Sequence, residues 1–191
     1  MKKIGVLALQ GAFVEHIQFL RKLGVDALPV RLPQELEGLN GLVIPGGEST
    51  AIAKLMQSYN LTKTIRELVS GGLPVFGTCA GMILLSRSAS QLNSGTIGAI
   101  DIEVTRNAFG RQINSFETDI HIPAIGERAF HAVFIRAPSI AKTGPRVEIL
   151  ARLEDGVSVA ARQGKVVVCA FHPELSDDLR LHRYFLETLA G

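Results

Sequence analysis

The sequence predicts an α/β fold in which a mainly parallel sheet is covered by helices on both faces. Three observations carry this prediction. Apolar runs alternate with helical patterns in the first half, short strand-like segments fill the second half, and glycines recur where strands end. Alternating strands and helices are typical of a parallel sheet, because each crossover helix packs back onto a sheet face. Such a sheet gathers its functional loops along one edge.

The first half contains the strand and helix signals of this fold in order. Continuous apolar runs predict strands buried on both sides, and apolar residues three and four positions apart predict helices. We expect strands at residues 3–9, 25–30, 41–44 and 73–77, and helices at residues 13–23, from residue 49 onward, at 62–69 and at 82–85.

The second half consists of short strand candidates separated by turn residues such as glycine, proline, asparagine and aspartate. We expect strands at residues 97–104, 118–122, 129–135, 147–153, 157–161 and 166–171. Their close spacing predicts antiparallel or mixed pairing. A last helix carries Leu181, Phe185 and Leu189 on its apolar face. Since no repeat or linker divides the chain, we expect one domain over residues 1–191.

The composition excludes several classes of protein. The 191 residues are 47% hydrophobic and 20% charged, which is typical of a globular protein. With 20 Lys and Arg against 18 Asp and Glu, the net charge is too small to indicate nucleic acid or an acidic membrane as a partner. No apolar run approaches the roughly 18 residues of a membrane span. Two cysteines in such a chain indicate a reducing compartment, so we expect a cytoplasmic protein.

The motif Gly77-Thr78-Cys79-Ala80-Gly81 lies between a predicted strand and a predicted helix. It has the form of a nucleophile elbow, in which a sharp turn exposes the middle side chain and small neighbours leave room. A helix N-terminus favours the thiolate of Cys79, and the N–H of Ala80 is placed to hold an oxyanion. The alternative, a small cysteine packed in the core, does not need the flanking glycines. Cys169, inside an apolar run, is expected in the core.

A cysteine nucleophile needs a general base that a third group orients. His172 ends a predicted strand, and Pro173 favours an extended backbone before it, so Glu174 is expected to project to the same side as His172. We therefore predict that Glu174 orients His172 toward Cys79; the alternative is a chance pair at a strand end. We expect the other histidines to be solvated or held by ordinary contacts, and to bind no metal: His16, His121, His131 and His182.

These motifs resemble those of the class I, triad-type glutamine amidotransferases. Further blocks resemble the glutaminase subunits of pyridoxal 5'-phosphate synthase, and they follow the order of that family along nearly the whole chain: residues 5–13, 45–50, 106–112, 134–138 and 171–175. The resemblance implies a three-layer, flavodoxin-like α/β fold and no cofactor. It also implies that Cys79 attacks the carboxamide of L-glutamine, with His172 as base and Glu174 as its orienting group, and that water then hydrolyses the glutamyl thioester.

The resemblance also implies where the substrate binds. Backbone N–H groups of Gly47 and Ala80 would form the oxyanion hole. The implied substrate-binding residues are Gly46, Gly47, Glu48, Arg106, Ile135 and Arg136. A guanidinium suits a carboxylate, although residue type alone does not favour Arg106 over Arg111. Gln10 follows the first strand on the same sheet edge, where we expect it to contact the substrate or a partner.

A separate synthase subunit is the expected partner. The chain has no phosphate-binding P-loop and no dinucleotide fingerprint, and it is too short to include a synthase domain. The resemblance implies that the partner combines ammonia with a pentose phosphate and a triose phosphate in a hetero-oligomeric complex. Because free ammonia would be lost or protonated, we expect a docked complex with a channel. We expect glutaminase activity to depend on docking, through rearrangement of the oxyanion hole near Gly47. Two other functions stay open: a cysteine peptidase or other amidase on a related fold, and a regulatory subunit without catalysis.

Overall fold

The computed structural model describes residues 1–92, 95–110 and 115–189, with the backbone alone at residues 188–189. The parallel part of its main sheet consists of β1 (Lys3–Leu7), β2 (Asp26–Val30), β3 (Gly41–Ile44), β4 (Val75–Thr78) and β12 (Val166–Cys169). These strands lie in the order β2-β1-β3-β4-β12, and each runs parallel to its neighbours. In this doubly wound order the carboxyl ends of the strands meet at one edge, where ligands bind.

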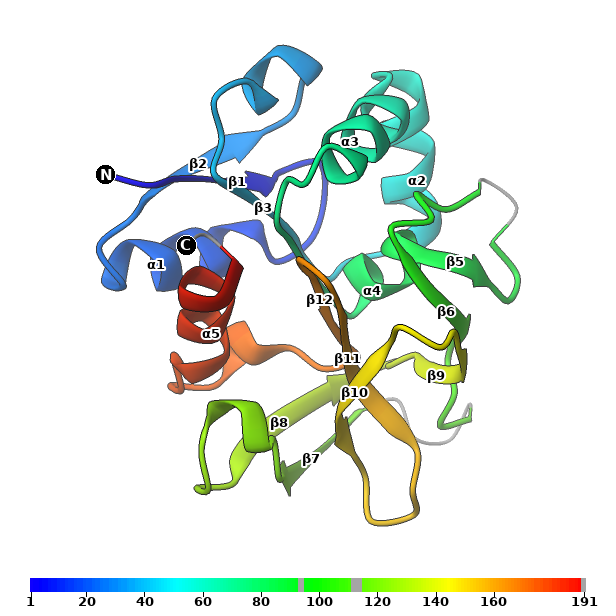
Figure 1. Ribbon diagram of the computed structural model, residues 1–191. Coiled ribbons are helices and arrows are strands. Elements are labelled where there is room, and N and C mark those ends of the chain that lie inside the picture. The colour runs from blue at the N-terminus through cyan, green and yellow to red at the C-terminus, as the bar shows by residue number, and fades with distance from the viewer. Residues whose placement is uncertain (93–94, 111–114, 190–191) are drawn as a thin grey trace.

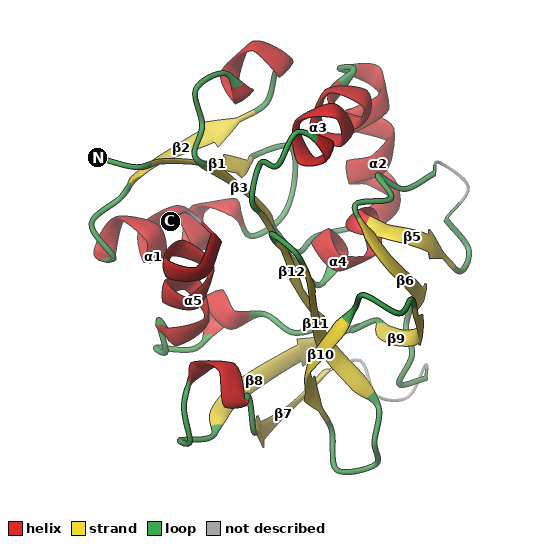
Figure 2. Cartoon of the chain, viewed as in Figure 1, coloured by secondary structure: helices red, strands yellow, loops and turns green. Residues whose placement is uncertain are grey.

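Helices cover both faces of the sheet, which confirms the predicted layering (Figures 1 and 2). One side carries α1 (Phe13–Lys22) and α5 (Arg180–Leu189). The other side carries α2 (Ser49–Ser58), α3 (Leu61–Ser70) and α4 (Ala80–Leu85). Apolar residues of these helices face the sheet, as the spacing of Ile17 and Leu20 on α1 predicts. None of the helices in the described residues is long and apolar enough to cross a membrane.

Beyond β12 the sheet becomes mixed, as predicted for the second half. It continues through β11-β9-β6-β5, with β10 paired to β11. These strands are β5 (Ser86–Ala89), β6 (Ile100–Thr105), β9 (Ser139–Thr143), β10 (Glu148–Arg152) and β11 (Ser158–Gln163). A hairpin of β7 (Ser115–Ile120) and β8 (Phe130–Ile135) forms a separate antiparallel pair. Short 3₁₀ turns complete the chain at Pro33–Leu36, Pro123–Ile125 and Pro173–Leu175.

Sequence patterns missed β5 and β9, because half of the β5 side chains and most of the β9 side chains are exposed and neither strand carries an apolar alternation. Some boundaries also differ. The first strand ends at Leu7 rather than at residue 9, and the strand expected at 118–122 is β7, three residues earlier at its start. These differences leave the order of the elements around the sheet edge unchanged.

Aromatic packing fixes the hairpin against the end of β12. Phe171, which follows β12, lies with its ring centroid 5.6 Å from that of Phe130 and 5.5 Å from that of Phe134, both on β8. The N–H of His172 donates to the Val133 carbonyl at 2.8 Å. The segment after β12 therefore packs against both the sheet and the hairpin. These contacts also fix the position of the residues that follow Phe171.

Candidate active site

Cys79 occupies a strained turn between β4 and α4. Its φ of 49° and ψ of −104° lie in a region that side-chain-bearing residues rarely adopt. The turn persists because its neighbours approach closely. The Cys79 N–H donates to the Cys169 carbonyl at 2.8 Å, and a Cβ on Gly81 would collide with the Ile44 carbonyl. The predicted elbow shape is therefore present, and Gly81 is required for backbone contact with β3. Cys169 itself is fully buried, as predicted.

Cys79 and His172 open into the same cavity, of about 440 Å³, at the carboxyl ends of β3, β4 and β12. The cavity brings together most of the residues that the sequence singled out, and adds others that it did not. It is lined by Gly47, Glu48, Ser49, Cys79, Ile83, Arg106, Asn107, Ile135, Arg136 and His172. Ser49 and Asn107 lie within the family-like blocks at 45–50 and 106–112 but were given no role of their own, and Ile83 carries no signal that separates it from an ordinary helix residue. Within the described ranges, no group of His, Cys, Asp and Glu side chains is arranged to hold a metal ion.

His172 and Glu174 form a direct pair. His172 Nδ1 lies 2.7 Å from Glu174 Oε1, and both side chains are nearly buried. The backbone that brings the two side chains together is not the extended one that the sequence predicted. Pro173–Leu175 form a 3₁₀ turn, which curls the carboxylate back beneath the ring. With Nδ1 bound to Glu174, the Nε2 edge of the imidazole is left for the cavity and Cys79.

The charge state of His172 reflects these neighbours. Burial lowers its pKa, but its contacts with the Cys79 thiol and the Glu174 carboxylate outweigh burial and raise the pKa to about 10. The site therefore stabilises an imidazolium next to a sulfur that can carry the compensating negative charge. A cysteine–histidine pair of this kind supplies a nucleophile at neutral pH.

Glu174 is held from a second side. Burial raises its pKa, yet the contacts with His16 and His172 prevail, so the pKa lies well below its ordinary value of 4.5. His16, on α1, places Nε2 3.2 Å from Glu174 Oε2. Sequence reasoning gave His16 no role. The sequence does contain a signal that His16 is buried. Its spacing from Phe13, Ile17 and Leu20 puts it on the same, buried face of the helix.

The loop after β3 presents its backbone to the cavity. A Cβ on Gly46 would collide with the His172 ring, so only glycine fits there. The Ala12 N–H donates to the Gly46 carbonyl at 3.0 Å, and Gln10 Oε1 accepts the Glu48 N–H at 2.8 Å. Gln10 thus lies against the loop rather than in the cavity lining. The segment that follows β1 fixes the orientation of the peptide groups around Gly47.

Glu48 and Arg106 lie together at the cavity wall. The Glu48 carboxylate accepts the N–H groups of Thr50 and Ala51 at the start of α2. Burial opposes ionisation of Glu48, but these hydrogen bonds and the charge of Arg106 lower its pKa overall. Arg106 Nη2 lies 3.7 Å from Glu48 Oε1. Arg111 and Gln112, from the block at 106–112, lie outside the described residues.

Ile135 and Arg136 enter from the end of β8. The Cys79 Sγ lies 3.8 Å from the Ile135 carbonyl oxygen, so the backbone of this strand end contacts the sulfur. Arg136 adopts a φ of 45°, which turns the chain at the cavity mouth. Ala80 is buried directly after Cys79 and is not part of the cavity lining.

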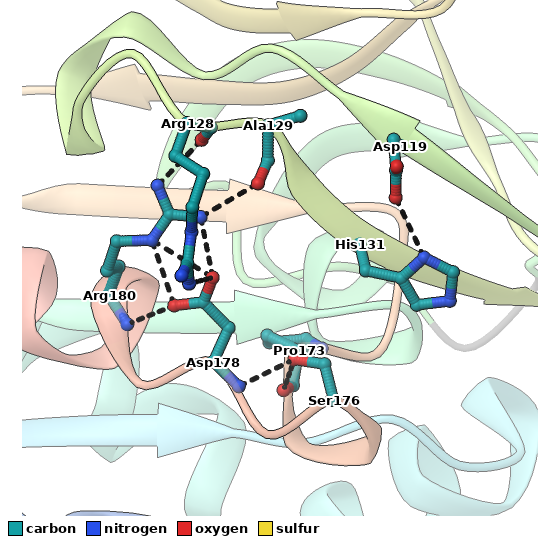
Figure 3. Close-up of polar contacts among 8 residues, drawn as sticks. All are labelled: Asp119, Arg128, Ala129, His131, Pro173, Ser176, Asp178 and Arg180. Atoms are coloured by element: carbon teal, nitrogen blue, oxygen red, sulfur yellow. Dashed lines mark hydrogen bonds and ion pairs between the residues drawn. The ribbon is translucent and has the colours of Figure 1, made fainter.

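A cluster of charges anchors the segment after Glu174 (Figure 3). The Asp178 carboxylate lies between the guanidinium groups of Arg128 and Arg180. Arg180 also donates to the carbonyls of Arg128 and Ala129, ahead of β8, at 2.7 and 2.9 Å. These contacts tie the start of α5 to the hairpin. The turn that holds Glu174 is therefore fixed at both of its ends.

Comparison with known proteins bears on this site. The sequence matches the SNO glutamine amidotransferase family over residues 6–190. It is 55% identical over 185 residues to pyridoxal 5'-phosphate synthase subunit PdxT of Carboxydothermus hydrogenoformans, covering 97% of this chain and 96% of that protein. It is 56% identical over 185 residues to the protein of the same name from Pelotomaculum thermopropionicum, covering 97% and 94%. A crystal structure of a glutamine amidotransferase has a TM-score of 0.92 at 50% identity over 98% of both chains.

Proposed function

Because the chain belongs to the SNO glutamine amidotransferase family, we propose that it is the glutaminase subunit of a pyridoxal 5'-phosphate synthase. One observation carries this proposal beyond family membership. Cys79 on a strained elbow and His172 share one cavity, and Glu174 Oε1 lies 2.7 Å from His172 Nδ1. That arrangement supplies a nucleophile, a base and an orienting carboxylate for amide hydrolysis.

The proposed reaction begins when the Cys79 sulfur attacks the side-chain carboxamide carbon of L-glutamine. Backbone N–H groups of Gly47 and Ala80 hold the oxyanion of the tetrahedral intermediate. His172 gives its proton to the departing nitrogen, which leaves as ammonia, and a glutamyl thioester remains on Cys79. His172 then takes a proton from water, the hydroxide adds to the thioester carbon, and glutamate leaves as the thiolate re-forms.

We propose that the cavity wall recognises the amino-acid end of glutamine. Glu48 is an ionised carboxylate suited to the substrate ammonium, and the guanidinium of Arg106 suits the substrate carboxylate. Gly46 leaves room beside the His172 ring, while Ile135 and Arg136 close the opposite side of the cavity. Gln10 either positions the substrate-binding loop, through its hydrogen bond with the Glu48 N–H, or contacts the partner subunit.

The proposal extends to the setting of the reaction. The 191 residues act as one glutaminase domain in the cytoplasm, without a cofactor, and deliver ammonia to a separate synthase subunit in a hetero-oligomeric complex. A reducing compartment is needed because Cys79 works as a thiolate. Docking is expected to raise the glutaminase rate, since it would close the open cavity against water.

The experiment is a measurement of glutamate release from glutamine, with and without the synthase subunit. We expect activity in the wild type and none in Cys79→Ala, while Cys169→Ala serves as the matched control at the buried cysteine. Cleavage of peptides without hydrolysis of glutamine would indicate a cysteine peptidase instead. If the Cys79→Ala variant still stimulated the synthase subunit with glutamine as the nitrogen source, the chain would be a regulatory subunit. A full glutaminase rate without the synthase would refute dependence on docking.

A further inference from the structure

Two histidines that the proposed reaction does not use lie buried beneath the Glu174 carboxylate. His16 on α1 and His182 on α5 are both completely buried. The His16 Nδ1 atom lies 2.8 Å from His182 Nε2. The His16 Nε2 atom lies 3.2 Å from Glu174 Oε2 and 3.1 Å from Thr78 Oγ1. Since α1 and α5 lie on the same face of the sheet, the two rings connect this helical layer to the site at the sheet edge (Figure 1).

The surroundings of the two rings decide where their protons lie. His182 packs beside Phe19 and Phe76, and its Nδ1 is buried without a hydrogen-bond partner in the described part of the chain. An unpaired lone pair there is less unfavourable than an unpaired buried N–H, so the proton belongs on Nε2. Burial lowers the pKa of His182 well below its ordinary range, which agrees with a neutral ring.

The direction of the whole chain of hydrogen bonds follows. His182 Nε2–H donates to His16 Nδ1, which must then be an acceptor. With Nδ1 as the acceptor, the proton of His16 lies on Nε2, which hydrogen-bonds Thr78 Oγ1 and lies 3.2 Å from Glu174 Oε2. The other oxygen, Oε1, accepts from His172 Nδ1. Glu174 Oε2 is buried and has no hydrogen-bond partner among the described residues. Its ion-pair contact is His16 Nε2 at 3.2 Å, an atom whose hydrogen bond goes to Thr78 Oγ1.

We propose that His16 is a positioning residue of the glutaminase. Its Nε2–H group, hydrogen-bonded to Thr78 Oγ1, lies 3.2 Å from Glu174 Oε2 and so keeps the carboxylate ionised and aligned on His172. The proposal rests on the glutaminase function proposed above. Without this N–H group the buried Oε2 atom would lose its ion-pair contact, so Glu174 would protonate more readily or turn away from His172. His182 supports the arrangement by fixing the tautomer of His16.

The pH dependence involves every titratable group that faces Glu174. They come from its own segment, from both covering helices and from the neighbouring strand ends: His172, His16, His182, Cys79 and Cys169. Of these, only His16 and His172 contact the carboxylate oxygens. Loss of the His16 N–H group beside Oε2 therefore shifts the acidic limb of activity to higher pH, because Glu174 then takes up a proton more easily.

The test compares His16→Asn with His16→Gln in the complex with the synthase subunit. The amide of Gln reaches the position of the ring Nε2 and can still place an N–H group beside Thr78 and Glu174, whereas that of Asn reaches only the position of Nδ1. We expect kcat for glutamine to fall about 10- to 100-fold in His16→Asn, with little change in KM, a shifted acidic limb, and near-normal values in His16→Gln. His121→Gln, at an exposed histidine, is the control.

Equal activity of His16→Asn and the wild type would overturn the proposal, as would equal losses in both His16 variants, which indicate a structural role alone. A wild-type complex that does not hydrolyse glutamine would instead refute the proposed function. If His16→Asn fails to fold, ¹⁵N NMR of the wild-type imidazoles decides the matter without any assay. We expect the protons of His16 and His182 on Nε2, and a proton on His16 Nδ1 would contradict the inference.

Discussion

At the scale of single residues, the site depends on where a few protons and charges are held. His172 combines a hydrogen bond to Glu174 with a neighbouring thiol, and these contacts raise its pKa to about 10 despite burial. Glu174 stays ionised because two histidines contact its two oxygens. The imidazole is therefore oriented and charged before the substrate arrives, which lowers the reorganisation that the reaction needs.

Glu174→Gln removes this charge while keeping the size of the side chain. We expect kcat for glutamine to fall by about 10²- to 10⁴-fold, because the His172 ring loses its tautomer and orientation. The pKa of His172 should fall below about 10, since one of the contacts that raise it is lost. An NMR titration and steady-state kinetics check both effects. Glu117→Gln, at an exposed carboxylate beside His131, should leave the rate unchanged.

The pH dependence of stability follows from the lowered pKa of Glu174. A carboxyl whose pKa is depressed in the folded state stabilises the fold above its unfolded pKa, ordinarily 4.5, and this contribution is lost as the pH falls through the folded value. The wild type should therefore be more stable than Glu174→Gln near neutrality. We expect the difference in unfolding free energy to begin to shrink below about pH 5 and to go on shrinking as the pH falls toward the folded pKa. A difference that stays constant over this range would contradict the assignment.

At the scale of elements, the elbow and the turn around Glu174 are each held by close backbone contacts. Gly81 brings α4 against the end of β3, and the Asp178 cluster joins α5 to the hairpin (Figure 3). Both contacts lie outside the cavity lining. They determine, however, how closely the nucleophile and its base can approach each other.

Gly81→Ala tests the elbow. The added Cβ would collide with the Ile44 carbonyl, a backbone atom at the end of β3 that cannot shift without moving the strand. We expect a loss of about 1–3 kcal/mol of unfolding free energy and a larger proportional loss of glutaminase activity. Gly71→Ala, at the exposed end of α3 where φ is −78°, is the control. Equal effects of the two substitutions would show that the close contact at Gly81 is not needed.

Asp178→Ala tests the anchor of the Glu174 turn. The carboxylate accepts the Arg180 N–H and binds two guanidinium groups, and it is only partly screened by solvent. We expect the unfolding free energy to fall by about 1–2 kcal/mol in denaturant titrations. Asp177→Ala, at the exposed neighbour, should change it by less than about 0.5 kcal/mol.

At the scale of the whole molecule, much of the architecture could be predicted from the sequence. Apolar runs located the parallel strands, and the flanking glycines of Cys79 indicated the elbow, because both depend on local pattern. The family that the motifs resemble is confirmed over residues 6–190. The 3₁₀ turn at Pro173–Leu175 and the burial of His16 beneath Glu174 depend on packing between elements far apart in the chain, so local patterns could not predict them.

The whole molecule also explains why a partner is expected. The cavity opens at the edge of the sheet, where β3, β4, β8 and β12 end, and its lining comes from both halves of the chain. Ammonia released there would be protonated in water unless a second protein covers the opening. The central claim is thus that Cys79 releases ammonia for use by a docked synthase.

The most direct test measures pyridoxal 5'-phosphate formation by the complex with either glutamine or ammonium as the nitrogen source. We predict that Cys79→Ala abolishes formation from glutamine and leaves formation from ammonium intact, because only the release of ammonia needs the thiol. Continued formation from glutamine by the Cys79→Ala complex would contradict the account.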